Sequence, residues 1–512
     1  MKIMLINISP HELRVIGYGV RILSSCMKRE GHHVETVFLH NYVGKRYEEQ
    51  TLNDLVELAA GSDLIGISLM TDNFENAVLI NKKLKDKLDI PIVWGGIHPT
   101  IRPAESLKYA DMVCIGEGED SLVELVRKME RGEDTHTVAG MWFKDNGRII
   151  KNSLRPLVED LDSIPFQDFD YETHYMLWGR EIRKMNEEML KLSVGREYLT
   201  LSSRGCPFAC TYCWNHAFHR LYPNQKMIRR RSVDNVIKEL VLIIGRFPFI
   251  QLFCIDDDAF FMRSKSEIAD FAGKYQEQVG VPLWITGASP LTVTREKLAL
   301  LTEGGMTSLR MGIQTGSERI KRLYGRNYSN RRVLRVVRMI NDYKDKIELP
   351  GYDIILDNPW ETEADVITTL RFLARFPTPY VLLLFPLILY PGTELYEKEK
   401  REKVMGHSPE ETWRRRHHEF ENTYLNNLFF LLSEYGQNNM RISVPVMFLL
   451  TSRPLRRWHL SELLFQILKK RVQGSLLERV KYLLREGMKD IARGDGSRIS
   501  SYLKNRTGIF DN

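Results

Sequence analysis

Three cysteines in one short run are the residues of this sequence with the clearest chemical meaning. Cys206, Cys210 and Cys213 follow the spacing Cys-x3-Cys-x2-Cys. A compact loop with three thiolates can hold three irons of a four-iron cluster, and such clusters normally take four cysteine ligands. One iron would therefore stay open to a small molecule. A zinc site is the alternative, because His216 or His219 could complete a tetrahedron of three cysteines and one histidine.

The other cysteines and the chain ends bear on the compartment. Cys26, Cys114 and Cys254 are isolated in or beside apolar segments, where a reduced, buried thiol is expected. This pattern fits a reducing cytosol and not a disulfide-bonded protein. The first residues do not have the pattern of a secretory signal, and no apolar run reaches the roughly 20 residues that a membrane span needs. We therefore expect a cytoplasmic protein without a transmembrane segment.

Length and charge set further bounds. The chain has 512 residues, which is enough for two or three domains. The net charge of +7 is modest for this length. We interpret basic runs such as residues 229–231 as solvated surface, with an anionic substrate or surface as the alternative, and expect no nucleic-acid partner.

The first region must place its functional residues at the ends of strands. Helical patterns separate five short apolar runs, at residues 3–8, 34–39, 64–69, 90–94 and 112–115. Such alternation predicts an α/β fold with a doubly wound, Rossmann-like parallel sheet, whose ligands bind at the carboxyl ends of the strands. A hairpin around Asp145-Asn146-Gly147 follows, and then an extended linker.

The second region repeats the alternation and contains the cysteine run just after its first strand. Six strands are expected, at residues 199–203, 250–255, 282–286, 308–313, 352–356 and 380–387. Six such units predict a partial (βα)6 barrel of the TIM type, with its chemistry at the strand carboxyl ends. The expected domains are residues 1–140, the hairpin and linker 141–194, the barrel 195–400 and a helical C-terminal region 401–512.

The cysteine run and several later motifs, over roughly residues 195–400, resemble the radical S-adenosylmethionine (SAM) superfamily. The resemblance implies that the three cysteines hold a [4Fe-4S] cluster, and that the amino and carboxylate groups of SAM occupy its open iron. An electron from the cluster would then cleave SAM to a 5′-deoxyadenosyl radical. Tyr212 matches the aromatic residue that commonly precedes the third cysteine.

Later motifs of the resemblance supply SAM contacts. One of Asp256, Asp257 and Asp258 stands where the family receives the SAM amino group, and a carboxylate facing an ammonium is a sensible pairing. Gln314, in the run Gly-Ile-Gln-Thr-Gly, matches a residue that hydrogen-bonds the ribose or the methionyl carboxylate. Ile355 matches an apolar residue that packs on adenine.

The loop after Ile355 departs from the family motif, because Asp357 and Trp360 replace two glycines. Both substitutions remove backbone freedom. We therefore expect this loop, and the adenine contacts beside it, to differ from those of the family.

The pairing of the first region with this barrel resembles the subgroup of radical SAM proteins that carry a cobalamin (B12)-binding domain. Residues after the third, fourth and fifth strands are the candidate cobalamin contacts: Ser68, Gly95, Gly96, His98, Gly116, Glu117 and Gly118. Tight turns that bind nothing are the alternative for the glycines. Residues 7–13 lack the Asp-x-His-x-x-Gly motif that supplies a histidine to cobalt, so we expect His98 to contact the nucleotide tail or a turn instead.

These resemblances imply a cobalamin-dependent radical SAM enzyme, most simply one that methylates an unactivated carbon. Cyclisation or rearrangement with the same cofactors is one alternative, and a non-catalytic metal-binding protein is another. The expected partners are a small-molecule or lipid-like substrate and an electron donor such as flavodoxin or ferredoxin. The start of the C-terminal region, with Trp413, His417, His418 and Phe420, is a candidate cap over the substrate. No catalytic residue can be named.

Overall fold

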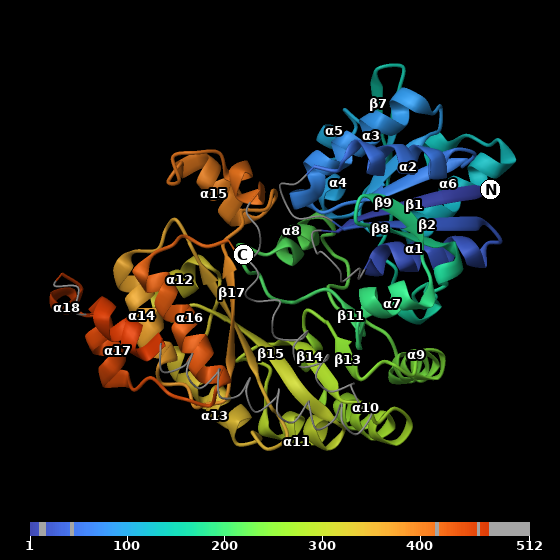
Figure 1. Ribbon diagram of the computed structural model, residues 1–512. Helices are drawn as coiled ribbons and strands as arrows, with labels where there is room; N and C mark the ends of the chain where they lie inside the picture. The colour runs from blue at the N-terminus through green and yellow to red at the C-terminus, as the bar shows by residue number, and fades with distance from the viewer. Residues whose placement is uncertain (10–16, 41–45, 415–418, 458–460, 470–512) are drawn as a thin grey trace.

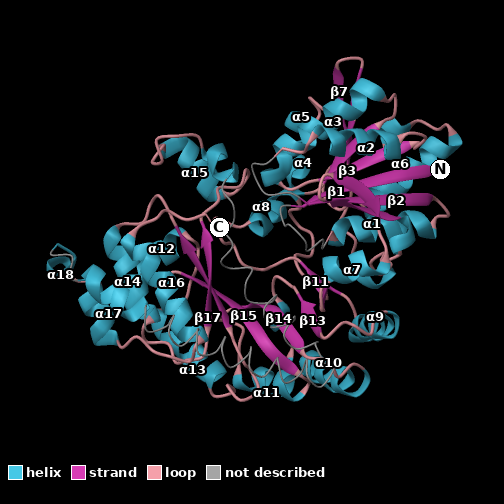
Figure 2. Ribbon diagram, in the orientation of Figure 1, coloured by secondary structure: helices cyan, strands magenta, loops and turns pink. Residues whose placement is uncertain are grey.

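The protein has an N-terminal α/β domain, a barrel-like second domain and a helical C-terminal region, as the computed structural model in Figure 1 shows. The structure describes residues 1–9, 17–40, 46–414, 419–457 and 461–469. Figure 2 shows a layer of strands flanked by helices in each of the two domains. The predicted α/β fold class, with a doubly wound sheet, a partial barrel and C-terminal helices, is confirmed.

Nine strands form the sheet of the first domain, in the order β7-β6-β5-β4-β3-β1-β2-β8-β9. Strands β1 to β5 and β8 are parallel, whereas β6, β7 and β9 run antiparallel to the strands that precede them in the chain. The central strands are continuous apolar runs because helices cover both of their faces. The bounds are β1 (Lys2–Ser9), β2 (His33–His40), β3 (Leu64–Ser68), β4 (Ile92–Gly95), β5 (Met112–Cys114), β6 (Met141–Asp145), β7 (Arg148–Lys151), β8 (His174–Trp178) and β9 (Glu181–Lys184).

Two long helices pack against each face of the central strands. One apolar cluster joins α1 (Tyr18–Arg29) and α6 (Glu119–Arg131) to one face, and another joins α2 (Glu49–Ala59) and α3 (Phe74–Lys87) to the other. The short helices α4 (Ile97–Ile101) and α5 (Pro103–Ser106) follow β4. The strand order reverses between β1 and β3, and such a reversal opens a ligand crevice at the carboxyl ends of the strands.

The sequence did not predict the second hairpin, β8 and β9, which lies within the segment expected to be a linker. β8 pairs in parallel with β2, and β9 returns antiparallel to it. Met176 of β8 packs with Phe38 of β2 and with Met189 of α7 (Glu187–Val194). The hairpin thus extends the first sheet before the chain enters the barrel.

The second domain is a six-stranded parallel sheet in chain order, β10-β13-β14-β15-β16-β17. In most of these strands, buried side chains on one side pack under the surrounding helices, and half-buried side chains on the other side face the lumen. The strands are β10 (Glu197–Thr200), β13 (Leu252–Ile255), β14 (Leu283–Ala288), β15 (Met306–Gln314), β16 (Gly351–Leu356) and β17 (Val381–Pro386). The helices are α9 (Val233–Arg246), α10 (Lys265–Gln278), α11 (Arg295–Glu303), α12 (Glu318–Leu323), α13 (Asn330–Asn341) and α14 (Glu363–Leu373).

The segment after β10 is inserted at the mouth of the barrel. A small antiparallel ribbon of β11 (Ser203–Arg204) and β12 (Arg229–Arg230) brackets it, and helix α8 (Trp214–Leu221) lies inside it. Figure 1 shows α8 between the first domain and the barrel. The cysteine run is therefore positioned where the two domains face each other.

The C-terminal region packs against the last barrel strand. Ser433 on α16 accepts a hydrogen bond from the Leu382 amide of β17 at 3.0 Å. His417 and His418 of the predicted cap lie outside the described residues, as does the end of the chain. Within the described part, no helix is long and apolar enough to cross a membrane. The helices are α15 (Glu394–Glu402), α16 (Tyr424–Gln437), α17 (Val444–Leu450) and α18 (Arg453–Arg457).

Candidate functional site

The three cysteines lie on a loop between β11 and α8. Cys213 is the N-cap residue of α8, and its amide donates to the Cys210 carbonyl at 3.0 Å. Thr211 anchors the loop to the barrel, because its hydroxyl donates to the Leu323 carbonyl at 2.7 Å and its amide donates to the Tyr324 carbonyl at 3.3 Å. The protein itself therefore fixes the path of the loop.

Gly205 allows the loop to begin. Its φ is +92°, and a Cβ atom added there would lie 1.7 Å from the Met227 carbonyl oxygen. A residue with a side chain would meet both backbone strain and a backbone clash. Glycine before the first cysteine is thus a structural requirement of this loop.

The thiol set fits the predicted iron-sulfur cluster. Burial raises the pKa of Cys206 to about 12 and of Cys213 to about 11, and the nearby charges of Asp258 and of Cys210 add to both shifts. A compact set of thiols in which burial penalises the ionised form favours a bound cation, which replaces their protons. The remaining cysteines are free and buried elsewhere, so the loop offers three thiolates and no fourth.

Of the two histidines of the zinc alternative, His219 has no hydrogen-bond partner among the described residues, whereas His216 is engaged. His216 is hydrogen-bonded to the Glu394 carboxylate at 2.8 Å, so this interaction would have to break. Zn–S bonds of about 2.3 Å would require thiolates within roughly 4 Å of one another. In the part of the chain that the structure describes, no group of three or more His, Cys, Asp or Glu residues is placed to hold a metal ion in this way.

Tyr212 and Ile355 lie in one apolar cluster at the mouth of the barrel. The Tyr212 hydroxyl accepts a hydrogen bond from Arg326 at 2.7 Å, and its ring packs edge-on against Tyr324, with the centroids 5.0 Å apart. The structure thus brings together two of the predicted SAM contacts, one from the cysteine loop and one from β16.

The three aspartates after β13 have different environments. Asp257 is buried, and its carboxylate accepts four hydrogen bonds from the amides and hydroxyls of Ser202 and Ser203, at 2.5–3.0 Å. Asp256 accepts one from the Thr286 hydroxyl at 2.9 Å. Asp257 therefore has no acceptor to spare, and it fixes the strand that leads into the cysteine loop.

Asp258 remains the best placed of the three for a ligand. Its side chain is exposed, and its charge contributes to the raised pKa values of Cys206 and Cys213. Protein groups around the carboxylate still displace part of its hydration, and this loss, together with the charges of Asp257 and Asp256, raises the pKa of Asp258 to about 6. A cationic ligand group beside it would stabilise the ionised form.

Gln314 presents an unpartnered acceptor near the same mouth. It ends β15 with a left-handed φ of +66°, and its side chain is 6% exposed. Its Oε1 atom has no hydrogen-bond partner among the described residues. Gly312 leaves room for this side chain, because an added Cβ would come within 2.7 Å of Gln314 Nε2. A buried amide in this state fits a residue that binds a polar ligand such as SAM.

The loop that departs from the family motif does keep a glycine-like conformation. Asp357 has φ +54°, a conformation that Asp tolerates better than most residues. Its carboxylate accepts from the Glu421 amide at 3.0 Å and from the Asn426 side chain at 2.7 Å. Trp360 donates to the Glu402 carboxylate at 2.9 Å. Both departures thus connect this loop to the C-terminal region.

The candidate cobalamin residues lie at the carboxyl ends of β3, β4 and β5. Ser68 ends β3, Gly95 ends β4, and Gly118 is the N-cap residue of α6. Gly96 is required by the fold, because its φ is +101° and an added Cβ would lie 2.6 Å from the Leu69 carbonyl oxygen. Gly116, with φ +87°, would place a Cβ 1.9 Å from the Tyr222 hydroxyl. At least two of the glycines therefore have structural roles at close approaches.

His98 is a buried imidazole without hydrogen bonds. It is 0% exposed, and neither ring nitrogen has a hydrogen-bond partner among the described residues, although Nε2 lies 3.8 Å from the Glu105 carboxylate. Its ring lies against Phe74 at 4.5 Å and Trp413 at 6.1 Å between centroids. Burial lowers its pKa to about 4, so the ring is neutral near pH 7. Trp413 therefore contacts the first domain, although it was predicted as part of a substrate cap.

Glu117 is engaged by protein groups. Its two carboxylate oxygens accept hydrogen bonds from Arg204 and Arg229 of the second domain. The prediction that Glu117 contacts cobalamin does not account for these ion pairs, which are long-range contacts that a single sequence does not reveal.

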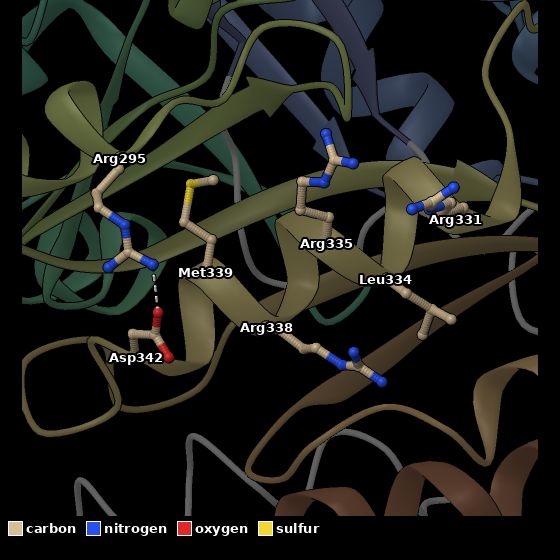
Figure 3. A pocket seen from close by; sticks show the side chains of 7 residues that line it. All are labelled: Arg295, Arg331, Leu334, Arg335, Arg338, Met339 and Asp342. Carbon is tan, nitrogen blue, oxygen red and sulfur yellow. Dashed lines mark hydrogen bonds and ion pairs between the residues drawn. The ribbon is translucent and has the colours of Figure 1, made fainter.

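A basic groove lies apart from these residues. It has a volume of about 410 Å³ and is lined by α11 and α13 (Figure 3). Arg295 pairs there with Asp342 at 2.6 Å, while Arg331, Arg335 and Arg338 follow one face of α13. Figure 1 shows both helices on the side of the barrel away from the first domain. We therefore do not assign the groove to the cofactor site.

Sequence reasoning missed the groups that hold the site together. Arg326 binds Tyr212, and Asn215 hydrogen-bonds Asp258. Asn215 was within reach of prediction, because it lies two residues after the third cysteine. Arg326 was not, because its partner is 114 residues away.

The fold and the site define a protein that pairs a B12-type sheet with a barrel bearing a three-cysteine loop. The model of the B12 binding domain matches residues 6–126, and the model of the radical SAM superfamily matches residues 200–373. The chain belongs to the radical SAM superfamily and carries an N-terminal B12-binding domain.

Several curated proteins are similar to this chain. An uncharacterized methyltransferase of Pyrococcus horikoshii is 26% identical, over 78% of this chain and 83% of that protein. The bacteriochlorophyllide d C-12(1)-methyltransferase of Chlorobaculum tepidum is 23% identical, over 69% of each chain. The anaerobic magnesium-protoporphyrin IX monomethyl ester cyclase of Rubrivivax gelatinosus is 24% identical, over 57% of this chain and 50% of the cyclase.

Solved structures share the fold. The radical SAM methyltransferase TsrM of Kitasatospora setae, with tryptophan and a SAM analogue bound, superposes with a TM-score of 0.61 at 17% identity, covering 78% of this chain and 76% of TsrM. The cobalamin-dependent enzyme OxsB, with aqua-cobalamin and SAM bound, superposes with a TM-score of 0.59 at 17% identity, covering 100% of this chain and 76% of OxsB.

Proposed function

We propose that this protein is a cobalamin-dependent radical SAM methyltransferase acting on an unactivated carbon. One observation carries the proposal: a loop with three thiols and no fourth lies at the mouth of a barrel, directly against the strand-end loops of a B12-binding domain. When bound, the cluster with SAM supplies a 5′-deoxyadenosyl radical, and cobalamin supplies a transferable methyl group.

The chain's own residues would bind and orient these groups. Cys206, Cys210 and Cys213 would hold the [4Fe-4S] cluster. The exposed carboxylate of Asp258 would receive the SAM ammonium, and the unpartnered amide oxygen of Gln314 would accept a hydrogen bond from its hydroxyl or amino groups. The apolar cluster around Tyr212 and the first domain above it would exclude water from the reacting groups.

The other partners follow from the same chemistry. We infer a small-molecule or lipid-like substrate that enters between the two domains, and an electron donor such as flavodoxin or ferredoxin. A cytoplasmic location fits an oxygen-sensitive cluster and the six unpaired cysteines.

Radical cyclisation is the second candidate, and the similarity to the Rubrivivax gelatinosus cyclase favours it. The same residues would hold the same cofactors, so product mass separates the candidates. Methylation adds one CH2 unit to the substrate, whereas ring closure adds no carbon.

The test starts from protein purified and reconstituted without oxygen. We expect iron, sulfide and corrinoid in the purified protein, and formation of 5′-deoxyadenosine from SAM under reduction. Cys206→Ala should abolish this product, whereas Cys26→Ala, in the first domain, should not. Stable zinc at the loop would contradict the proposal, and a cluster that never cleaves SAM would favour a non-catalytic role.

A further inference from the structure

A four-membered ion-pair cluster joins the first domain to the cysteine loop. Glu117, just after β5, accepts from Arg204 Nη1 at 2.9 Å and from Nη1 and Nη2 of Arg229 at 2.8 Å each. Arg204 also pairs with Glu119, and Arg229 also donates to the Val158 carbonyl at 2.7 Å. Two cations thus meet two anions.

This cluster is mostly enclosed. The side chain of Arg229 is 3% exposed, that of Glu119 10%, that of Glu117 13% and that of Arg204 18%. Enclosed charges of this kind are costly unless each one is paired. The geometry of the pairs therefore constrains how the two domains can sit against each other.

The loop that follows β5, which contains Gly116 and Glu117, contacts both flanks of the cysteine loop. Arg204 stands two residues before the first cysteine, and its strand β11 pairs with β12, which contains Arg229. On the other flank, Tyr222 is the C-cap residue of α8, the helix that begins after the third cysteine. Gly116 approaches Tyr222 so closely that an added Cβ would lie 1.9 Å from its hydroxyl.

We propose that Glu117 is a positioning residue, which holds the B12-binding domain in register with the cluster loop and so sets the separation of the two cofactors. Both of its carboxylate oxygens already accept charged donors, so it has no need of a cofactor contact. This inference rests on the proposed function.

Two reactions of SAM distinguish a residue that positions the two domains from a residue that binds a cofactor. Reductive cleavage of SAM needs the cluster alone. Methylation of cob(I)alamin needs both cofactors in register: the S–CH3 bond of SAM breaks, and its electron pair stays on sulfur as S-adenosylhomocysteine forms. The electron pair of cob(I)alamin makes the new Co–CH3 bond. Neither assay requires the substrate, and titanium(III) citrate supplies the electrons.

The experiment compares Glu117→Gln and Arg204→Gln with a matched control, Glu124→Gln. Glu124 lies on α6 after Glu117 and pairs with Arg155, away from the cysteine loop. In both test variants we expect methylation of cob(I)alamin to slow at least tenfold, while abortive 5′-deoxyadenosine formation and the affinities for cobalamin and SAM change less than twofold. The control should match the wild type.

Electron paramagnetic resonance supplies a readout that does not depend on turnover. The reduced cluster speeds the spin relaxation of nearby cob(II)alamin, and we expect this enhancement to weaken in both test variants. A cobalamin affinity reduced more than tenfold by Glu117→Gln would make Glu117 a cofactor contact and overturn the proposal. Unchanged cob(I)alamin methylation would overturn it as well.

The experiment also covers a test variant that fails to fold and a wild type that lacks the cofactor chemistry. If Glu117→Gln fails to fold, because Arg229 is left buried without its partner, Arg204→Gln decides, since it leaves the pair of Glu117 with Arg229 in place. If the wild type binds no corrinoid or cleaves no SAM, the proposed function itself fails. That result is distinct from a wild type that performs both reactions and variants that lose one.

Discussion

The three consecutive aspartates allow a sharp test of how SAM is held. Each is changed in turn to asparagine, which keeps the shape of the side chain and removes its charge. Asp257 already accepts four hydrogen bonds, whereas Asp258 is exposed beside the cysteine loop. We therefore expect Asp258→Asn to weaken SAM binding and Asp257→Asn to weaken the fold.

The expected sizes follow from the environments. A hydrogen bond to a charged group contributes about 1.5–3 kcal/mol, and the exposure of Asp258 places it near the lower end. About 1.5–2 kcal/mol corresponds to a roughly 10- to 30-fold higher Kd for SAM. At Asp257 the asparagine NH2 group replaces an oxygen that accepts two of the four hydrogen bonds, so we expect a loss of about 2–3 kcal/mol of stability, or a Tm lower by roughly 5 °C or more.

The measurements are SAM binding by calorimetry on reconstituted protein and Tm by scanning fluorimetry. Asp256→Asn serves as the matched control, because Asp256 is also exposed but binds the Thr286 hydroxyl, whereas the charge of Asp258 acts on Cys206 and Cys213. The reasoning is refuted if Asp258→Asn leaves the Kd unchanged, or if Asp257→Asn raises the Kd without lowering Tm.

Three other predictions concern loops around the site. Burial raises the pKa of Glu361 to about 8, so near pH 7 its carboxyl is protonated in the folded protein and ionised in the unfolded chain. Raising the pH from 6 to 8 should therefore lower the Tm of the wild type more than that of Glu361→Gln. Gly116→Ala should cost about 2–4 kcal/mol through left-handed strain and the clash with Tyr222, and Tyr222→Ala should relieve part of this loss in thermal unfolding. Asp357→Ala should increase proteolysis near residue 421, because the carboxylate that binds Asn426 is lost. Asn426→Asp should increase it as well, because two carboxylates would then repel each other.

The strands were predictable because parallel strands covered on both faces need continuous apolar runs. Ten of the eleven runs expected to form strands of the two parallel sheets overlap the observed strands by three residues or more, and the run at 199–203 overlaps β10 and β11 by shorter stretches. The hairpin of β8 and β9 was missed because β9 is mostly charged and Ile182 is its one apolar residue. The apolar residues of the hairpin also follow a proline-containing linker, and nothing local marks their pairing with β2.

The candidate site also has features that could be predicted from the sequence and features that depend on distant residues. The cysteine loop could be predicted, because its chemistry depends on spacing within eight residues of sequence. The assignment among the aspartates could not, because it depends on Ser202 and Ser203, more than 50 residues earlier. The role of Glu117 depends on arginines 87 and 112 residues away.

Asp357 shows why a departure from a family motif need not disrupt the backbone that the motif describes. Glycine is favoured there because φ is positive, and Asp adopts φ +54° in this chain, at a cost of about 1–2 kcal/mol. Two hydrogen bonds to the C-terminal region, each contributing about 0.5–1.5 kcal/mol or more with a charged acceptor, offset that cost. The exchange converts a flexible glycine into a tether. Movement of the C-terminal region would therefore be transmitted to the loop that follows Ile355, the predicted adenine contact.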